Sequence, residues 1–123
     1  MIRIDIPAEQ VAGVLVYLVY APLWYGNADY LRSRICQLID AASGPIHAVV
    51  LDVAGMSDID YTGLLVLRDL VTELGQRGVT VAIARASHLV HHDLKHGAIL
   101  QQLGPGHLFS SVDQAVTALQ HHP

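Results

Sequence analysis

The sequence predicts an α/β fold: one domain built on a mixed, mostly parallel central β-sheet of about four to five strands, with about four helices packed on it. Its 123 residues suffice for a single domain. Hydrophobic residues make up 52% and charged residues 15%, which excludes intrinsic disorder. Apolar runs typical of strands alternate with segments of helical periodicity, and this order requires crossover connections and hence parallel pairing.

Five segments predict strands. Residues 2–6 alternate apolar and polar side chains, as in a strand with one covered face. Residues 13–20 are rich in β-branched and aromatic residues. Residues 47–53 and 79–84 are nearly unbroken apolar runs, which suit strands covered on both faces, and residues 107–109 form a brief extended piece. We expect an antiparallel addition near the N-terminus.

Four segments predict helices. The first begins with Asn27 as the N-cap and ends before residues 43–45, Ser-Gly-Pro. The second begins near residue 60 or 61 and closes at residues 75–78. A short helix is expected over residues 88–97 and an amphipathic one over residues 111–121. Strands and helices thus alternate from residue 27 onward.

The predicted domain spans residues 11–119, after an N-terminal strand or linker over residues 1–10 and before a tail over residues 120–123. Residues 11–28 carry no charge, and their length of 18 matches a transmembrane helix. Pro22 and Gly26 interrupt this run, and its β-branched content favours a strand followed by a turn. No positively charged leader precedes it, so a signal peptide is not expected.

The charges and the cysteine exclude two further classes. Seven Lys and Arg against eleven Asp and Glu give a net charge of −4, and the cations are scattered. No nucleic-acid partner is therefore expected. A single cysteine, Cys36, cannot form an internal disulfide, which excludes a disulfide-stapled secreted scaffold and favours a reducing compartment.

Three carboxylates lie close together in the sequence after the third predicted strand: Asp52, Asp58 and Asp60. Ligands gather at the carboxyl ends of strands in such sheets, so this group is a candidate for Mg²⁺ or a phosphoryl group. The alternative is that Ser57, Asp58 and Asp60 are turn and capping residues of the following helix. A phospho-accepting receiver domain would also need an acidic pair after its first strand, which this sequence lacks.

Other chemistry is weakly supported. His88, His92 and His96 recur every four residues and would share one helical face, either as a solvated polar surface or as a weak Ni²⁺ or Zn²⁺ site. The sequence contains no Gly-x-Ser-x-Gly motif and no phosphate-binding loop of the Gly-x4-Gly-Lys type. It therefore favours a binding or regulatory module over an enzyme, with no resident metal.

Residues 50–64 carry a family resemblance. Their sequence, Val-Leu-Asp-Val-Ala-Gly-Met-Ser-Asp-Ile-Asp-Tyr-Thr-Gly-Leu, resembles the signature of STAS domains, in which a buried strand leads to a turn that opens a helix. Two branches share this domain: the anti-sigma factor antagonists and the cytoplasmic C-terminal domains of SulP-type sulfate and anion permeases. Residues 21–31, beginning Ala-Pro-Leu-Trp-Tyr-Gly-Asn-Ala, look like the permease branch. With residues 78–84 and 108–116, the resemblance covers about residues 10–119.

The resemblance implies a cytoplasmic regulatory domain that acts through its transport domain, a second copy, a regulatory protein or weakly bound nucleotide, with no other cofactor. It implies a contact site at Asp58, Asp60, Tyr61, Thr62 and Gly63. In antagonists, the position of Tyr61 holds a serine that a kinase phosphorylates, so Thr62 is the remaining candidate phosphoacceptor here. The alternative function is a free-standing, antagonist-like regulator that binds a kinase or anti-sigma partner.

Overall fold

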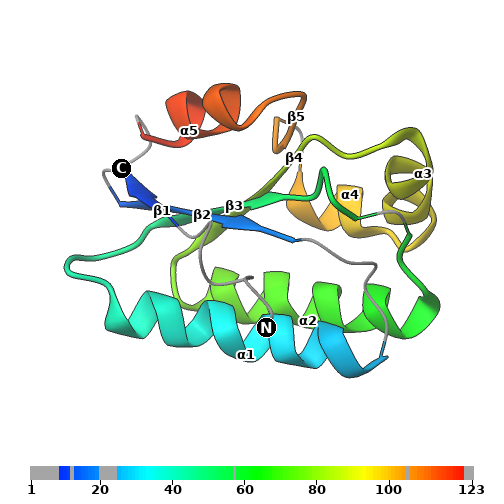
Figure 1. Cartoon of the computed structure of the whole chain (residues 1–123), viewed down its shortest axis with the longest axis horizontal. Coiled ribbons are helices and arrows are strands. Elements are labelled where there is room, and N and C mark those ends of the chain that lie inside the picture. The colour runs from blue at the N-terminus through cyan, green and yellow to red at the C-terminus, as the bar shows by residue number, and fades with distance from the viewer. Residues whose placement is uncertain (1–8, 12, 20–24, 57, 105, 121–123) are drawn as a thin grey trace.

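The computed structural model describes residues 9–11, 13–19, 25–56, 58–104 and 106–120. They form one sheet whose strands lie in sequence order (Figure 1). The strands are β1 (Glu9–Val11), β2 (Val14–Leu18), β3 (Ala48–Asp52), β4 (Thr80–Ala84) and β5 (Leu108–Phe109). β1 pairs antiparallel with β2, and all later neighbours pair parallel. The predicted mixed, mostly parallel sheet is confirmed.

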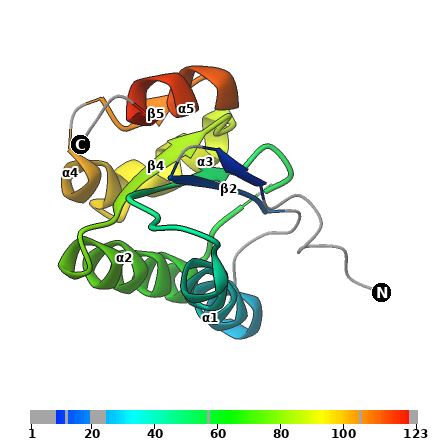
Figure 2. The same cartoon turned by 90° about the vertical axis from the view of Figure 1, so that its left-hand side faces the viewer.

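Helices cover both faces of the sheet. They are α1 (Tyr25–Ala41), α2 (Tyr61–Gln76), α3 (His88–His96), α4 (Ile99–Leu103) and α5 (Val112–Gln120). α1 and α2 lie side by side on one face, and α5 alone lies over the other (Figures 1 and 2). α3 and α4 extend the first layer beyond β4. The structure is thus a three-layer α/β sandwich in which several helices pack on one face of the sheet and α5 alone packs on the other.

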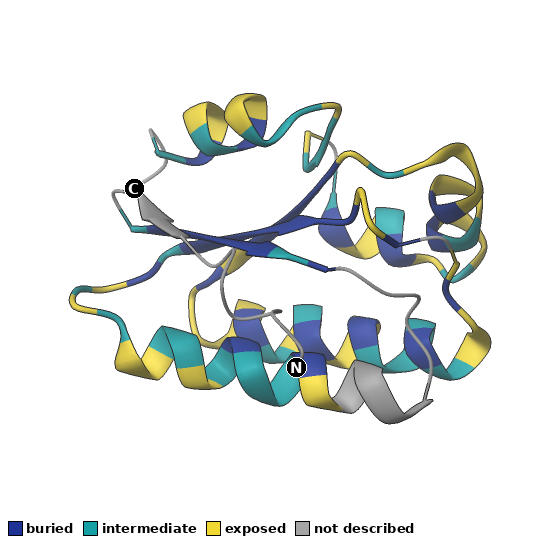
Figure 3. Ribbon diagram, viewed as in Figure 1, coloured by how far each residue is buried: buried dark blue, intermediate teal, exposed yellow. Residues whose placement is uncertain are grey.

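β3 is the centre of the core. All five of its residues are buried, and most of β2 and β4 is buried with it (Figure 3). One apolar cluster fills the space between the sheet and α1 to α4, where it includes Leu51, Leu70 and Leu94. A smaller one lies under α5 and includes Val50 and Leu119. This burial on two faces explains the unbroken apolar run in the sequence.

The structure corrects three local expectations. The first helix begins at Tyr25, so Asn27 lies inside α1 instead of capping it. The antiparallel strand is β1, whereas the strand predicted over residues 2–6 lies outside the described residues. The short helix α4 was not expected, and it follows a break at Ala98, whose φ of 62° is left-handed. The described chain therefore has five helices, one more than predicted.

α1 and α2 also share a polar contact. Nη1 of Arg32 donates to Oε1 of Glu73 at 2.9 Å, and Sγ of Cys36 lies 3.5 Å from Oε2 of the same carboxylate. Burial raises the pKa of the Cys36 thiol above its ordinary value of 9.0, and the charge of Glu73 raises it further. The thiol is therefore held in its protonated form.

A substitution at Gly13, in the turn between β1 and β2, tests the importance of the left-handed backbone conformation there. Gly13 has φ +85°, and a Cβ added there would lie 2.6 Å from Nδ1 of His47. Gly13→Ala should therefore lower the free energy of unfolding by roughly 1–3 kcal/mol, measured by urea denaturation. Gly44→Ala is the control, because its added Cβ would meet nothing within 4 Å. Equal effects of the two changes would contradict this reading of the turn.

The Cys36 environment predicts a pH dependence. As pH rises past 9.0, the unfolded thiol loses its proton before the folded one does. The contribution of Cys36 to stability is thus complete below the unfolded pKa and is lost as pH rises through the folded pKa. Urea denaturation over a range of pH that begins below 9.0 and extends above it should show wild type losing stability relative to Cys36→Ser as pH rises. A constant difference between the two proteins over this range would refute the assignment.

Candidate functional site: the loop before α2

The predicted contact residues form the end of the β3–α2 connection, Asp58–Gly63, called here the contact loop. Asp60 is the N-cap of α2, with φ −80° and ψ 175°, and its Oδ1 accepts a hydrogen bond from the N–H of Gly63 at 2.7 Å. The capping role expected for Asp60 is confirmed. Asp58 is exposed and its carboxylate makes no hydrogen bond within the described chain. Ser57 lies outside the described residues.

Two buried side chains fix the base of the loop. Met56 and Ile59 are 3% and 4% exposed and belong to the main apolar cluster. The N–H of Ile59 donates to Oδ2 of Asp93 in α3 at 3.3 Å. The loop is therefore held from below by the core and from the side by α3.

The outer part of the loop is open to solvent. Tyr61, the first residue of α2, is 75% exposed, the largest value among the exposed large hydrophobic side chains of the described chain. Asp58 and Asp60 are exposed beside it, and Thr62 is half-buried. An exposed aromatic ring and exposed carboxylates on one loop with a fixed base are suited to binding a partner surface.

Asp52 has a different role from the other two carboxylates. It is 7% exposed, the only buried charged residue of the described core, and its Oδ1 accepts from Nε of Arg85 at 3.0 Å and from the N–H of Ala54 at 3.1 Å. Arg85 follows β4 with a left-handed φ of 62°. Asp52 thus links the carboxyl ends of β3 and β4. Its Oδ1 already accepts two hydrogen bonds, so this atom is not available as a ligand of a metal ion.

The metal alternatives find no support in the described residues. No three His, Cys, Asp or Glu side chains among them gather in a way that could hold an ion. His88, His92 and His96 are all exposed on α3, and the rings of His92 and His96 lie edge to face with centroids 4.1 Å apart. This is the solvated polar face that the sequence allowed.

Sequence reasoning missed Arg85 and Asp93 as parts of the site. In the sequence, Arg85 is only one of seven scattered cations, and nothing there gives Asp93 a role. A signal for Arg85 existed: it directly follows the strand after β3, and carboxyl ends of parallel strands share one edge of the sheet. No local sequence pattern predicts the contact of Asp93 with Ile59, because the two residues are 34 positions apart.

Known proteins match this chain over most of its length. The STAS domain family profile matches residues 5–115, and the chain belongs to this family. A probable sulfate transporter of Mycobacterium tuberculosis is 33% identical over 113 residues, which are 92% of this chain and 20% of that protein. The chain thus spans about a fifth of this relative's length. The resemblance to the STAS family in the sequence is confirmed.

Solved structures of both branches share the fold. The murine anion transporter Solute Carrier 26 family member A9, in its inward-facing state, superposes with a TM-score of 0.80 at 24% identity over 93% of this chain and 19% of that one. The anti-sigma factor antagonist SpoIIAA in its unphosphorylated form gives 0.71 at 16% identity over 94% and 96% of the two chains. Among the described helices of this chain, none has the length and apolar content needed to span a membrane.

The cap of α2 gives a direct test. Asp60→Ala removes the acceptor for the N–H of Gly63 and should lower the free energy of unfolding by about 1 kcal/mol. Asp58→Ala, which changes an exposed carboxylate without a hydrogen bond, should stay within about 0.5 kcal/mol of wild type. Urea unfolding followed by far-ultraviolet circular dichroism measures both. A larger loss for Asp58→Ala than for Asp60→Ala would overturn the capping assignment.

Proposed function

We propose that this chain is a non-catalytic regulatory domain of a SulP-type transporter of sulfate or another anion, placed on the cytoplasmic face of the membrane. The observation that carries the proposal is the construction of the contact loop. Its base is held by Ile59 and Asp93, while the side chains of Tyr61, Asp58 and the helix-capping Asp60 are exposed at its surface. Such a surface presents a fixed set of groups to a partner without reorganising.

The comparisons support the transporter branch. The M. tuberculosis relative, whose name is that of a probable sulfate transporter, aligns with nearly all of this chain. We infer that the first partner is a transmembrane transport domain in the same polypeptide. A second copy of the domain and regulatory proteins are further partners on this proposal.

The charge of the contact loop indicates what kind of group it binds. Asp58 and Asp60 come shortly before the exposed Tyr61 in the chain, and two exposed carboxylates with an exposed aromatic ring favour cationic side chains of a partner through ion pairs and cation–π contacts. The N-terminus of α2 attracts phosphate, but the same two carboxylates repel it. Nucleotide binding at this loop is accordingly proposed to be weak.

A free-standing, antagonist-like regulator is the second candidate. The observation in its favour is the half-buried hydroxyl of Thr62 in the first turn of α2, which makes no hydrogen bond within the described chain. Phosphorylation there would place new charge at the helix N-terminus and close to Asp60. Detection of phosphate on Thr62 in cells, together with loss of a bound kinase in Thr62→Glu, would favour this candidate.

A chimeric transporter tests the first proposal. The segment of the M. tuberculosis relative that aligns with this chain would be replaced by this chain, and sulfate uptake would be measured in cells. We expect uptake above that of the transporter lacking the segment. Tyr61→Ala should lower the uptake rate at equal protein level, because it removes the exposed ring at the contact surface.

Tyr30→Ala is the matched control, since Tyr30 is also an exposed tyrosine, 49% accessible, but lies in α1. It should leave uptake unchanged. Uptake no higher than without the segment would contradict the assignment to a transporter. Equal effects of the two tyrosine changes would show that the contact loop is not the regulatory surface.

A further inference from the structure

The sheet has an open stretch of edge beside β4. β5 pairs only with the last two residues of β4, in the register Ile83↔Leu108 and Ala84↔Phe109. No described strand continues this pairing toward the start of β4, although Thr80 to Ala82 remain paired with β3 on the other side. Three of the five residues of β4 therefore lack a strand neighbour on the outer side within the described sheet.

The backbone polar groups of Val81 face this open edge. Alternate residues of a strand direct their N–H and C=O groups to opposite neighbours. The N–H of Thr80 bonds to His47 on the β3 side at 2.9 Å, and the N–H of Ile83 bonds to His107 on the β5 side at 2.9 Å. Val81, two residues before Ile83, shares its direction. No hydrogen bond of the described chain engages the N–H or the C=O of Val81.

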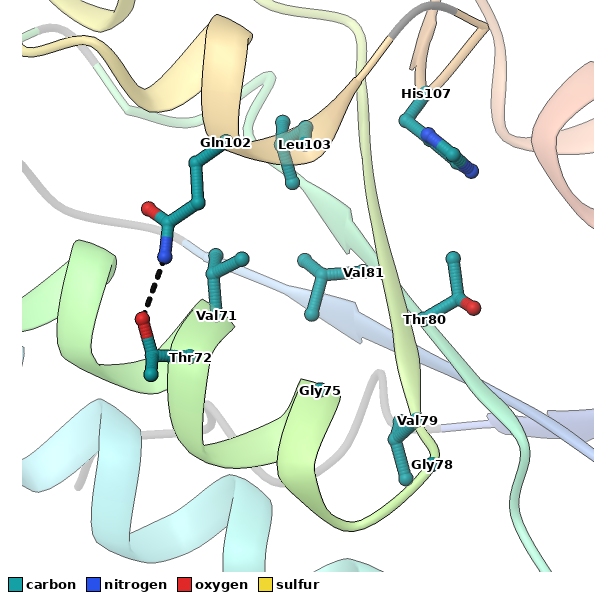
Figure 4. A pocket seen from close by; sticks show the side chains of 10 residues that line it. All are labelled: Val71, Thr72, Gly75, Gly78, Val79, Thr80, Val81, Gln102, Leu103 and His107. Carbon is teal, nitrogen blue, oxygen red and sulfur yellow. Dashed lines mark hydrogen bonds between the residues drawn. The ribbon is translucent and has the colours of Figure 1, made fainter.

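A cavity of about 420 Å³ lies against this edge (Figure 4). Val71 and Thr72 of α2 form one wall, and Gln102 and Leu103 of α4 form another. Gln102 joins the two walls, since its Nε2 donates to Oγ1 of Thr72 at 2.6 Å. Among the described residues that line the cavity there is no Asp, Glu, Lys or Arg.

His107 adds an unsatisfied polar atom at the upper end of the cavity. Its Nδ1 is buried and has no hydrogen-bond partner among the described residues. A second cavity of about 220 Å³ also has Leu103 and His107 in its lining. The first cavity, beside β4, is called the groove below. Buried polar atoms are normally paired, so this nitrogen is an exception within the described chain.

We propose that this groove binds an uncharged extended peptide segment of a partner protein, which adds to the sheet beside β4. Val81 would supply one donor and one acceptor to the backbone of the segment, and Val71 and Leu103 would contact its aliphatic side chains. Among the residues that line the cavity, Val79 to Val81 span about 10 Å at about 3.3 Å per residue. The N–H of Val79 already donates to the carbonyl of Leu74 at 2.8 Å, so Val81 is the residue that pairs with the segment. The groove therefore matches about three residues of the segment.

Two further observations favour a peptide over a charged small molecule. The lining offers no charged side chain that could neutralise one. The edge also lacks the lysines, prolines and inward-pointing charges that commonly prevent strand addition, since Thr80, Val81 and Ala82 are all uncharged. The groove lies at the start of β4, whereas the contact loop follows the end of the parallel β3, so this inference does not rest on the proposed function.

The test uses the full chain labelled with nitrogen-15 and a capped pentapeptide of alternating threonine and valine as the probe. We expect saturable amide shifts confined to residues around the groove, with Val81 and His107 among them. Amide hydrogen exchange at Val81 should slow when the probe is bound, because its N–H then has an acceptor. No saturable shifts, or shifts only elsewhere in the protein, would overturn the proposal.

Two controls separate strand addition from simple apolar binding. The same pentapeptide with N-methylated amides cannot pair with an edge and should bind about tenfold more weakly or worse. Thr80→Lys places a charge at the exposed edge and should weaken binding of the unmodified probe by about tenfold, whereas Thr117→Lys on the exposed surface of α5 should not. Equal binding of both probes, or equal affinity of the two variants, would reject the proposal.

Discussion

The burial of β3 on both faces is the constraint on which the rest of the structure depends. A strand with five buried residues needs a neighbour on each side and a layer above and below, and the chain supplies all four. β2 and β4 pair with it in parallel along its full length. Parallel neighbours require crossovers, which place α1 and α2 on the same face. α5 then closes the other face through Ala115 and Leu119.

The carboxyl end of β3 shows how this buried strand gives rise to a surface site. Asp52 is the point where the apolar run ends, and a carboxylate that is 7% exposed requires partners. Arg85 and the N–H of Ala54 supply them. Arg85 reaches Asp52 from a left-handed backbone position, which a non-glycine residue rarely adopts. The chain leaves the sheet from a fixed point, and the contact loop begins four residues after Ala54.

Much of this fold could be predicted because its determinants are local. Unbroken apolar runs placed β3 and β4 within a residue or two, and an Asp three residues before Gly63 is enough to indicate the N-cap of α2. The failures depend on tertiary contacts. β1 has three residues and a mixed composition, so it is a strand only because β2 offers it an edge. α4, with five residues, is too short for periodicity to reveal.

The same division applies to the candidate site. The polar residues of the contact loop were visible in the sequence, because turn and capping chemistry acts over three or four residues. The bonds that hold the loop and its base were not, since Asp93 is 34 residues from Ile59 and Arg85 is 33 residues from Asp52. Exposure of Tyr61 is equally invisible in a sequence, where an aromatic residue at the start of a helix is as consistent with a core position as with a surface.

The parallel order of the sheet separates the two surfaces proposed for this domain. Because β3 and β4 run in the same direction, the contact loop after β3 and the open start of β4 lie at opposite ends of the strands. A partner bound at the contact loop would leave the start of β4 accessible, so both surfaces can be occupied at once. The two surfaces also differ in chemistry: carboxylates and an exposed ring at the loop favour cations, whereas the uncharged groove offers backbone pairing. One small domain could thereby join a charged surface to an extended, neutral segment without competition between them.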